Sequence, residues 1–243
     1  MNSNKMTVRI TDILPRKAAK IAGVVYLICF VLGVFSNMFV RPSLIVYGDA
    51  ATTVKNIIAN ESLFRMGLMS DLLFLTVWLL LPLALYKLLK PVNNIHAVLM
   101  VLFALVMVPI MFINNVFQFA ALLLLSGADY LTVFETGQLH TQVMFFLDLH
   151  NHGWLMAQIF WGLWLFPFGY LVYKSGLVYK SGYIPKILGV LLMIGCFGYL
   201  IEFFTLILFP DFDMPIAQLT SLGEALAPFW LLFIAGKIPE MKS

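Results

Sequence analysis

The sequence contains few charged residues, and this scarcity sets its class. Only 11% of the 243 residues are Asp, Glu, Lys or Arg, whereas 62% are hydrophobic and the mean hydropathy is +0.95. Soluble domains are about half apolar and about a quarter charged, so the composition excludes an ordinary soluble globular domain. It is typical of a polytopic helical membrane protein, in which each span needs roughly 20 apolar residues.

Cysteines, cationic clusters and catalytic motifs are also scarce. The two cysteines, Cys29 and Cys196, lie inside apolar runs, where packed thiols are expected in place of a disulfide or metal site. There is no basic patch with interleaved aromatic residues, so no nucleic-acid partner is expected. No His-Glu-x-x-His pattern, Gly-rich phosphate loop or Gly-x-Ser-x-Gly elbow occurs. The sequence therefore identifies neither a catalytic motif nor a cofactor.

Six long apolar runs predict an all-α fold with six transmembrane helices in one bundle. The runs cover residues 17–40, 63–89, 96–125, 143–173, 184–209 and 219–235. No small-residue cleavage site follows the first run, so we interpret it as a retained span. Between the first two runs, residues 49–60 predict a short external amphipathic helix. The expected organisation is a membrane domain over 17–236 with short tails at 1–16 and 237–243.

The distribution of cations predicts the orientation of these spans. Twelve of the fifteen Lys and Arg residues lie in the N-terminal segment, the 87–95 and 174–186 connections and the C-terminal segment. An excess of cations marks the cytoplasmic side of a membrane protein. We therefore expect a multi-pass protein of the cell (inner) membrane, surrounded by lipid bilayer, with both termini in the cytoplasm.

One connection contains a direct repeat. Leu-Val-Tyr-Lys-Ser-Gly occurs twice in succession, over residues 171–176 and 177–182. Insertions are best tolerated in surface loops, because loop length has little energetic cost. The repeat is therefore expected to lengthen a cytoplasmic loop between the fourth and fifth spans.

Ionisable and amide side chains inside the apolar runs are the strongest functional signal. Such groups are costly in hydrocarbon and are usually functional or tightly paired. With the predicted orientation, they fall in the outer half of the membrane, so we expect them to line an outward-facing polar cavity. The candidate ligand-binding residues are Asp71, Asn114, Gln118, Asp148, His150, His152, Glu202 and Glu224.

The fourth span divides its polar residues between two helix faces. Asp148 and His152 are four residues apart and share a face, whereas His150 points about 200° away from Asp148. We expect the first face to meet Asn114, Gln118 and at least one further acid. In the alternative interpretation, Asp148 and His152 are interhelical hydrogen-bond partners only. His150 is then a core histidine bonded to a carbonyl, and Glu224 bonds nearby hydroxyl groups.

Several segments carry a resemblance to a known family. They are residues 16–23, 48–52, 62–65, 123–130, 149–150 with Gly153, 182–189 and 223–224. On these segments, the chain resembles the bacterial membrane proteins grouped as domain of unknown function 4386, from about residue 15 to 236. The resemblance implies the membrane fold and supplies no mechanism, and the second copy of the Tyr-Lys-Ser-Gly turn departs from the family pattern.

Two functional hypotheses compete with a purely structural role for the acids. The first is binding or transport of a small solute or cation through the polar cavity. The second is a metal-dependent intramembrane hydrolase with Asp148 and His152 as ligands and Glu224 or Glu202 as general base. Catalytic zinc sites usually have three ligands rich in histidine, so the sequence favours the first hypothesis and no metal site.

Overall fold

A computed structural model describes residues 15–179, 183–209 and 214–237, which form helices and the connections between them, without a β-strand. Six helices in the described residues are long and apolar enough to cross a membrane, which confirms the predicted all-α, six-span architecture. The elements are α1 (Pro15–Val34), η1 (Phe35–Val40, a π-helix), α2 (Arg41–Leu44), α3 (Ala50–Ala59), α4 (Glu61–Trp78), α5 (Leu80–Leu89), α6 (Asn94–Leu124), η2 (Asp129–Leu131), α7 (Thr136–Tyr179), α8 (Tyr183–Leu208), α9 (Ile216–Thr220) and α10 (Leu222–Lys237).

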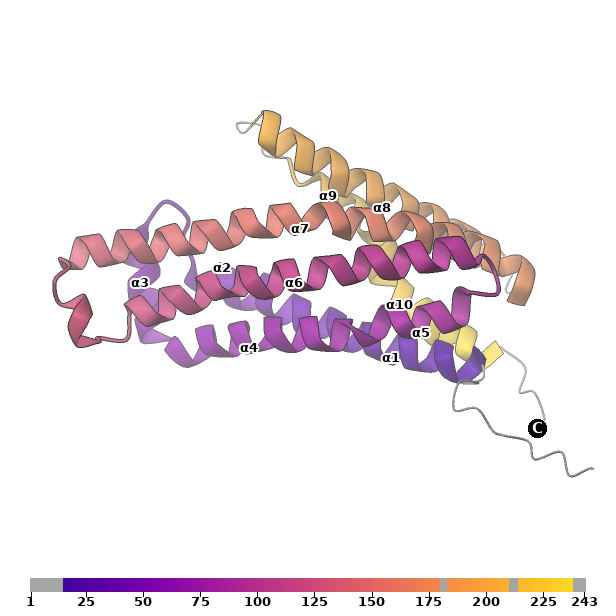
Figure 1. The fold of residues 1–243 in the computed structure, drawn as a ribbon, viewed down its shortest axis with the longest axis horizontal. Coiled ribbons are helices and arrows are strands. Elements are labelled where there is room, and N and C mark those ends of the chain that lie inside the picture. Colours follow the sequence, from indigo (N-terminus) through magenta and orange to yellow (C-terminus); the bar gives the residue numbers. More distant parts are fainter. Residues whose placement is uncertain (1–14, 180–182, 210–213, 238–243) are drawn as a thin grey trace, which may run out of the picture.

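The spans form a closed ring in which each one packs beside its neighbours in the sequence. α1 contacts α4 and α5, these contact α6, and α6 packs along α7. α7 then packs on α8, α8 on α10, and α10 returns to α1. Figure 1 shows α1 beginning and α10 ending at the same end of the bundle, with α3 and η2 at the opposite end.

Two spans contain local irregularities in their helices. The second span is divided at Leu79 into α4 and α5. Pro82 explains this break, because its ring clashes with the carbonyl group four residues earlier, that of Trp78. The first span widens into the π-helix η1 over Phe35–Val40, and Pro42 acts there on the carbonyl group of Met38, four residues earlier. Such π segments occur frequently at functional sites.

Two apolar clusters form the interior. The larger one is built around Trp78, Trp164 and Phe168, which are at most 1% exposed. The smaller one joins η1, α2, α3, α4, α6 and α7 near the end with α3. Many large apolar side chains on the outside remain exposed, as a lipid environment requires.

The predicted external helix is α3. Asp49 caps it by accepting hydrogen bonds from the Thr52 N–H at 2.9 Å and the Thr52 hydroxyl at 2.7 Å. These bonds favour the carboxylate and lower the pKa of Asp49 below its ordinary value. Val54 and Ile57 are buried against the bundle, so α3 covers one end of it.

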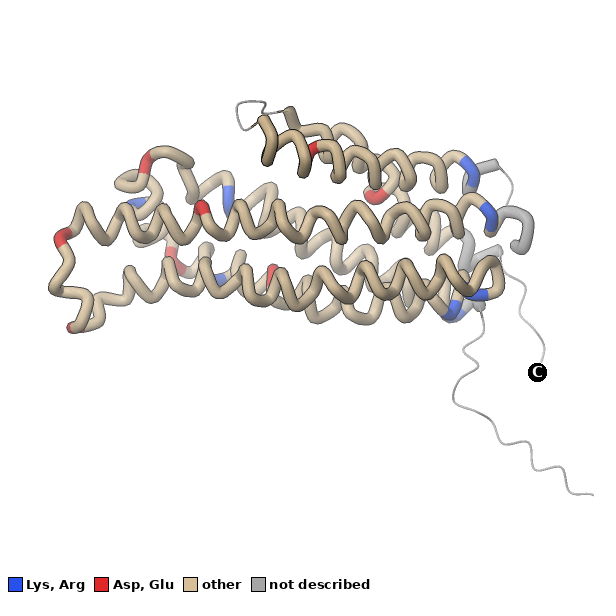
Figure 2. The backbone as a smooth tube through the Cα atoms, turned by 45° about the horizontal axis from the view of Figure 1, so that its top comes forward, with Lys and Arg blue, Asp and Glu red and all other residues tan. Residues whose placement is uncertain are grey.

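Charged residues are segregated along the bundle. In Figure 2, most of the Lys and Arg residues lie at the end where α1 begins, whereas the Asp and Glu residues and a few further cations lie toward the middle and the opposite end. This segregation agrees with the concentration of Lys and Arg in a few segments of the sequence.

The loop prediction for the direct repeat was wrong for the first copy. α7 has 44 residues and continues through residues 171–179, so the first copy and half of the second are helical. Residues 180–182 lie outside the described part of the chain. At 1.5 Å per residue, α7 is about 66 Å long, roughly twice the hydrocarbon thickness. Apolar periodicity could not reveal this extension of the helix, because a segment with Tyr, Lys, Ser and Gly fits a loop as well as it fits a helix outside the hydrocarbon.

Candidate functional site

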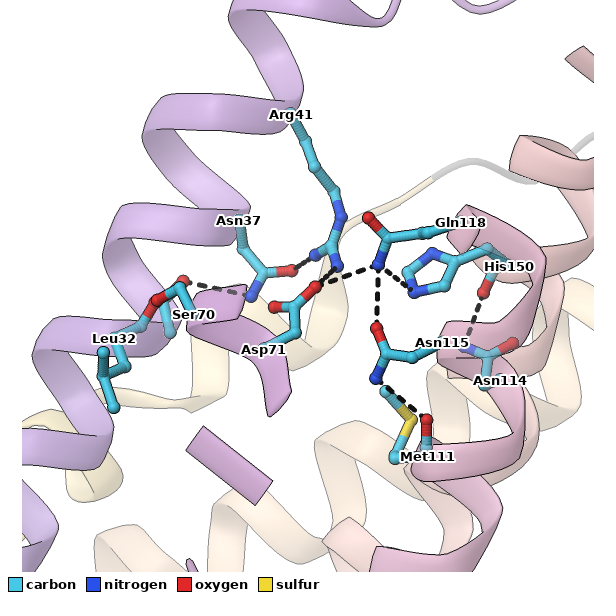
Figure 3. A network of polar contacts seen from close by, with 11 residues as sticks. Leu32, Asn37, Arg41, Ser70, Asp71, Met111, Asn114, Asn115, Gln118 and His150 are labelled. Atoms are coloured by element: carbon cyan, nitrogen blue, oxygen red, sulfur yellow. Dashed lines mark hydrogen bonds and ion pairs between the residues drawn. The ribbon is translucent and has the colours of Figure 1, made fainter. Parts of the chain in front are cut away.

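A buried ion pair joins the first two spans. Arg41 Nη2 donates to Asp71 Oδ2 at 2.5 Å, and the two side chains are only 16% and 11% exposed. Arg41 Nη1 also donates to the Asn37 Oδ1 on η1. Figure 3 shows these side chains converging with groups from α6 and α7. We call Asn37, Arg41, Asp71, Asn114, Asn115, Gln118 and His150 the Arg41–Asp71 network.

Gln118 connects this pair to the other helices. Its Nε2 lies 2.9 Å from Asp71 Oδ2, 2.9 Å from Asn115 Oδ1 and 2.9 Å from His150 Nε2. His150 Nε2 accepts from the amide when the imidazole proton is on Nδ1. An amide nitrogen has two hydrogens, so three acceptors share two donors. The network therefore has a surplus of acceptors around Gln118.

His150 and Asn114 hold α6 against α7. Asn114 Nδ2 donates to the His150 carbonyl at 2.9 Å, while Asn114 Oδ1 is buried without a hydrogen-bond partner. A Cβ atom on Gly153 would overlap the Asn114 amide. Glycine at position 153 is therefore what allows the two helices to approach closely.

The network lies between the two apolar clusters. Asn114, Asn115, Gln118 and His150 are each 3–5% exposed, so lipid and bulk water reach them poorly. Along α6, the polar residues lie between Met111, which belongs to the larger cluster, and Leu122, which belongs to the smaller one. The polar layer thus crosses an otherwise apolar interior.

A cavity of about 220 Å³ borders this layer. Its polar residues are Asn37, Asp71 and Asn115. The remaining walls are apolar or aromatic, and they are formed by Phe30, Gly33, Val34, Met38, Phe74, Leu75, Met111, Trp154 and Trp161. The cavity is therefore mainly apolar with one polar end, which corrects the expectation of a polar cavity.

Glu202 and Glu224 belong to a second polar group. Glu224 accepts from Trp161 Nε1 at 2.7 Å and from the Tyr199 hydroxyl at 2.7 Å. Glu202 accepts from Gln158 Nε2 at 2.8 Å and from the Ala217 N–H at 2.7 Å. The alternative interpretation predicted that hydroxyl groups near Glu224 in the sequence would donate to it. Its donors are instead the aromatic side chains of Trp161 and Tyr199, from other helices. Trp161 links this group to the cavity, because its ring forms part of the wall.

The predicted face of α7 was wrong. His150 meets Asn114 and Gln118, whereas His152 is exposed and its Nδ1 lies 2.8 Å from the Asp148 carbonyl of its own helix. Asp148 is partly exposed, and its side chain makes no hydrogen bond with any described residue. A helical wheel gives the angle between two faces, but it does not say which face points inward.

The geometry likewise does not assemble the ligands of the hydrolase hypothesis. Asp148 and His152 do not converge with Glu202 or Glu224, which have other partners. Across residues 15–179, 183–209 and 214–237, no group of three or more His, Cys, Asp or Glu residues is placed to hold a metal ion.

Sequence reasoning missed Arg41 as a site residue, together with Asn37 and Asn115. Arg41 was interpreted as the end of the first span, where a cation is ordinary. The available signal was the spacing of Asn37 and Arg41, four residues apart at the end of an apolar run that faces a span containing Asp71. A buried acid and a cation on neighbouring spans often pair.

These features define a six-span membrane protein with a buried polar network beside a mainly apolar cavity. The chain belongs to the family described as Domain of unknown function (DUF4386), whose model matches residues 21–235. A protein of Archaeoglobus fulgidus, described as an uncharacterized protein, is 33% identical over 162 residues, which cover 66% of this chain and 78% of the relative. No solved structure matches the chain.

Proposed function

We propose that this protein binds a small amphipathic solute in the cavity between α1, η1, α4, α6 and α7, as a binding or transport protein of the membrane. The observation that carries the proposal is the position of Asp71, which pairs with Arg41 and also lines the cavity of about 220 Å³. Ligand sites are typically apolar concave spaces with a few convergent polar groups. A bare cation is a poorer candidate, because Arg41 already balances the Asp71 charge.

Brominated hexyl compounds with different head groups test this proposal. Bromine quenches indole fluorescence on contact, and Trp154 and Trp161 lie in the cavity wall. The protein is placed in phosphatidylcholine nanodiscs and titrated with each compound. Saturable quenching by at least one compound is expected, since binding sites are finite in number.

Gly33→Leu supplies the matched control. A Cβ atom at Gly33 has the Phe74 ring as its nearest neighbour, at 3.8 Å, so the added side chain enters free space in the cavity. Saturable quenching should disappear in Gly33→Leu and weaken in the smaller variant Gly33→Ala. Quenching that never saturates and is equal in all three proteins would reflect partition into lipid and would refute the proposal.

We further propose that residues 17–236 form a membrane domain of the cell membrane with both termini in the cytoplasm. The support is that twelve of the fifteen Lys and Arg residues lie in the four sequence segments that this orientation places on the cytoplasmic side. In sealed cells, a membrane-impermeant thiol reagent should label Asp129→Cys and leave Lys90→Cys unlabelled, after both native cysteines are replaced by alanine. Labelling of Lys90→Cys alone would invert the orientation.

A further inference from the structure

The hydrogen-bonding capacity left at the polar end of the cavity limits the chemistry of the solute. This inference rests on the proposed solute-binding function. Both hydrogen bonds described for the Asp71 carboxylate end at Oδ2, from Arg41 and Gln118. Figure 3 shows the second carboxylate oxygen without a partner among the residues drawn. Asp71 lines the cavity, so Oδ1 is a strong acceptor available to a bound molecule.

The neighbouring amides add weaker donors to this acceptor. Asn37 Nδ2 donates to the Gly33 carbonyl at 3.0 Å, and Asn115 Nδ2 donates to the Met111 carbonyl at 2.9 Å. Each amide nitrogen carries two hydrogens, so each residue retains one N–H. A solute group that donates to Asp71 and accepts from an asparagine uses both kinds of capacity.

The balance of charge then distinguishes between head groups. A carboxylate on the solute would face Asp71 and be repelled by it. An ammonium group would donate to Asp71, but it has no acceptor and would add a net positive charge beside the neutral Arg41–Asp71 pair. An uncompensated charge beside mainly apolar walls is costly. A hydroxyl group donates and accepts without changing the charge.

We infer that the cavity takes a neutral, hydroxyl-ended solute with an apolar body, bound through Asp71 Oδ1. The aromatic side chains of Phe30, Phe74, Trp154 and Trp161 line the part of the cavity that would contact the apolar body. Such a solute belongs to the class of apolar alcohols.

Four brominated hexyl probes that share one chain test this inference in the same nanodiscs. The probes are 6-bromohexanol, its methyl ether, 6-bromohexanoate and 6-bromohexylammonium. The ether can accept but cannot donate, so it lacks the bond to Asp71. We expect the alcohol to saturate at about tenfold lower concentration than the ether, as one hydrogen bond of about 1.4 kcal/mol implies. The carboxylate and the ammonium probe should bind more weakly than the alcohol.

The outcomes separate this inference from the proposed function. Equal saturation by the ether and the alcohol, or tighter saturable binding of either charged probe, would overturn the hydroxyl assignment and leave solute binding intact. If none of the four probes gave saturable quenching, and quenching in Gly33→Leu equalled that in the wild type, both the hydroxyl assignment and the proposed solute binding would be overturned. An alcohol preference that is lost in Gly33→Leu would support both.

Discussion

Replacing Asp71 by asparagine should destabilise the folded protein by about 3–5 kcal/mol. The variant Asp71→Asn keeps the shape of the side chain, and its carbonyl oxygen can still accept from Gln118. It removes the negative charge that lies 2.5 Å from Arg41 Nη2, where the two side chains are 16% and 11% exposed. A guanidinium group would then remain buried without a counter-charge.

The magnitude follows from the geometry of the pair. Two unit charges about 4 Å apart interact by about 4 kcal/mol at an effective dielectric constant of 20. Burial of both side chains limits screening by water, and Arg41 Nε already lacks a hydrogen-bond partner. The other acceptors of the network are uncharged amide and imidazole groups, so none of them supplies the lost counter-charge.

Equilibrium unfolding in mixed micelles, induced by SDS, measures this loss. The matched control is Asp148→Asn, which makes the same change at a partly exposed acid. It should change the free energy of unfolding by less than about 0.5 kcal/mol. The double variant Arg41→Met, Asp71→Leu removes both charges and should recover most of the stability. Equal stability of Asp71→Asn and the wild type, or a double variant less stable than Asp71→Asn, would refute the reasoning.

Three further predictions concern other parts of the structure. Gly153→Ala should cost about 1–3 kcal/mol in the same unfolding assay because its Cβ overlaps a side chain of α6, whereas Gly33→Ala should cost nothing. Tyr199→Phe removes a 2.7 Å hydrogen bond and should cost about 1–3 kcal/mol. Tyr86→Phe removes only a solvent-exposed hydrogen bond of 3.2 Å and should be neutral, so equal losses in the two variants would contradict this prediction. Because its pKa is lowered, Asp49 should stabilise α3 fully above pH 3.8 and lose this effect as pH falls below that value. The protection factors of the α3 amides, which correct hydrogen exchange for its intrinsic pH dependence, should therefore fall there in the wild type and not in Asp49→Asn.

The sequence predicted the six spans well because lipid imposes a strong composition on them. The structure places the third span at Asn94–Leu124 and the fifth at Tyr183–Leu208, close to the predicted 96–125 and 184–209. The second span was also correct, and its break could be anticipated from Pro82. The extension of α7 was not predictable, because the part of a helix that lies outside the hydrocarbon has no characteristic hydropathy.

The site was predicted less completely, for a physical reason. Polarity inside an apolar run identified Asp71, Gln118 and His150 as unusual, but pairing depends on how each helix is rotated about its axis. That rotation is set by packing, for example by the glycine at position 153. The predicted convergence of all the acids was therefore replaced by two separate groups, one around Asp71 and the other around Glu202 and Glu224.

The π-helix η1 relates the length of the first span to the direction of Arg41. A π turn holds about one residue more than an α turn, so removing a single residue within Phe35–Val40 would let the segment return to regular α-helix. Both kinds of turn complete one rotation, so Arg41 would still face Asp71 after this deletion. A deletion within the regular part of α1 has no wide turn to absorb it, and it would rotate the two sides of the span by about 100° relative to each other. The hydrophobicity of the span would hardly change in either case, so the ion pair distinguishes two deletions that membrane insertion alone would treat alike.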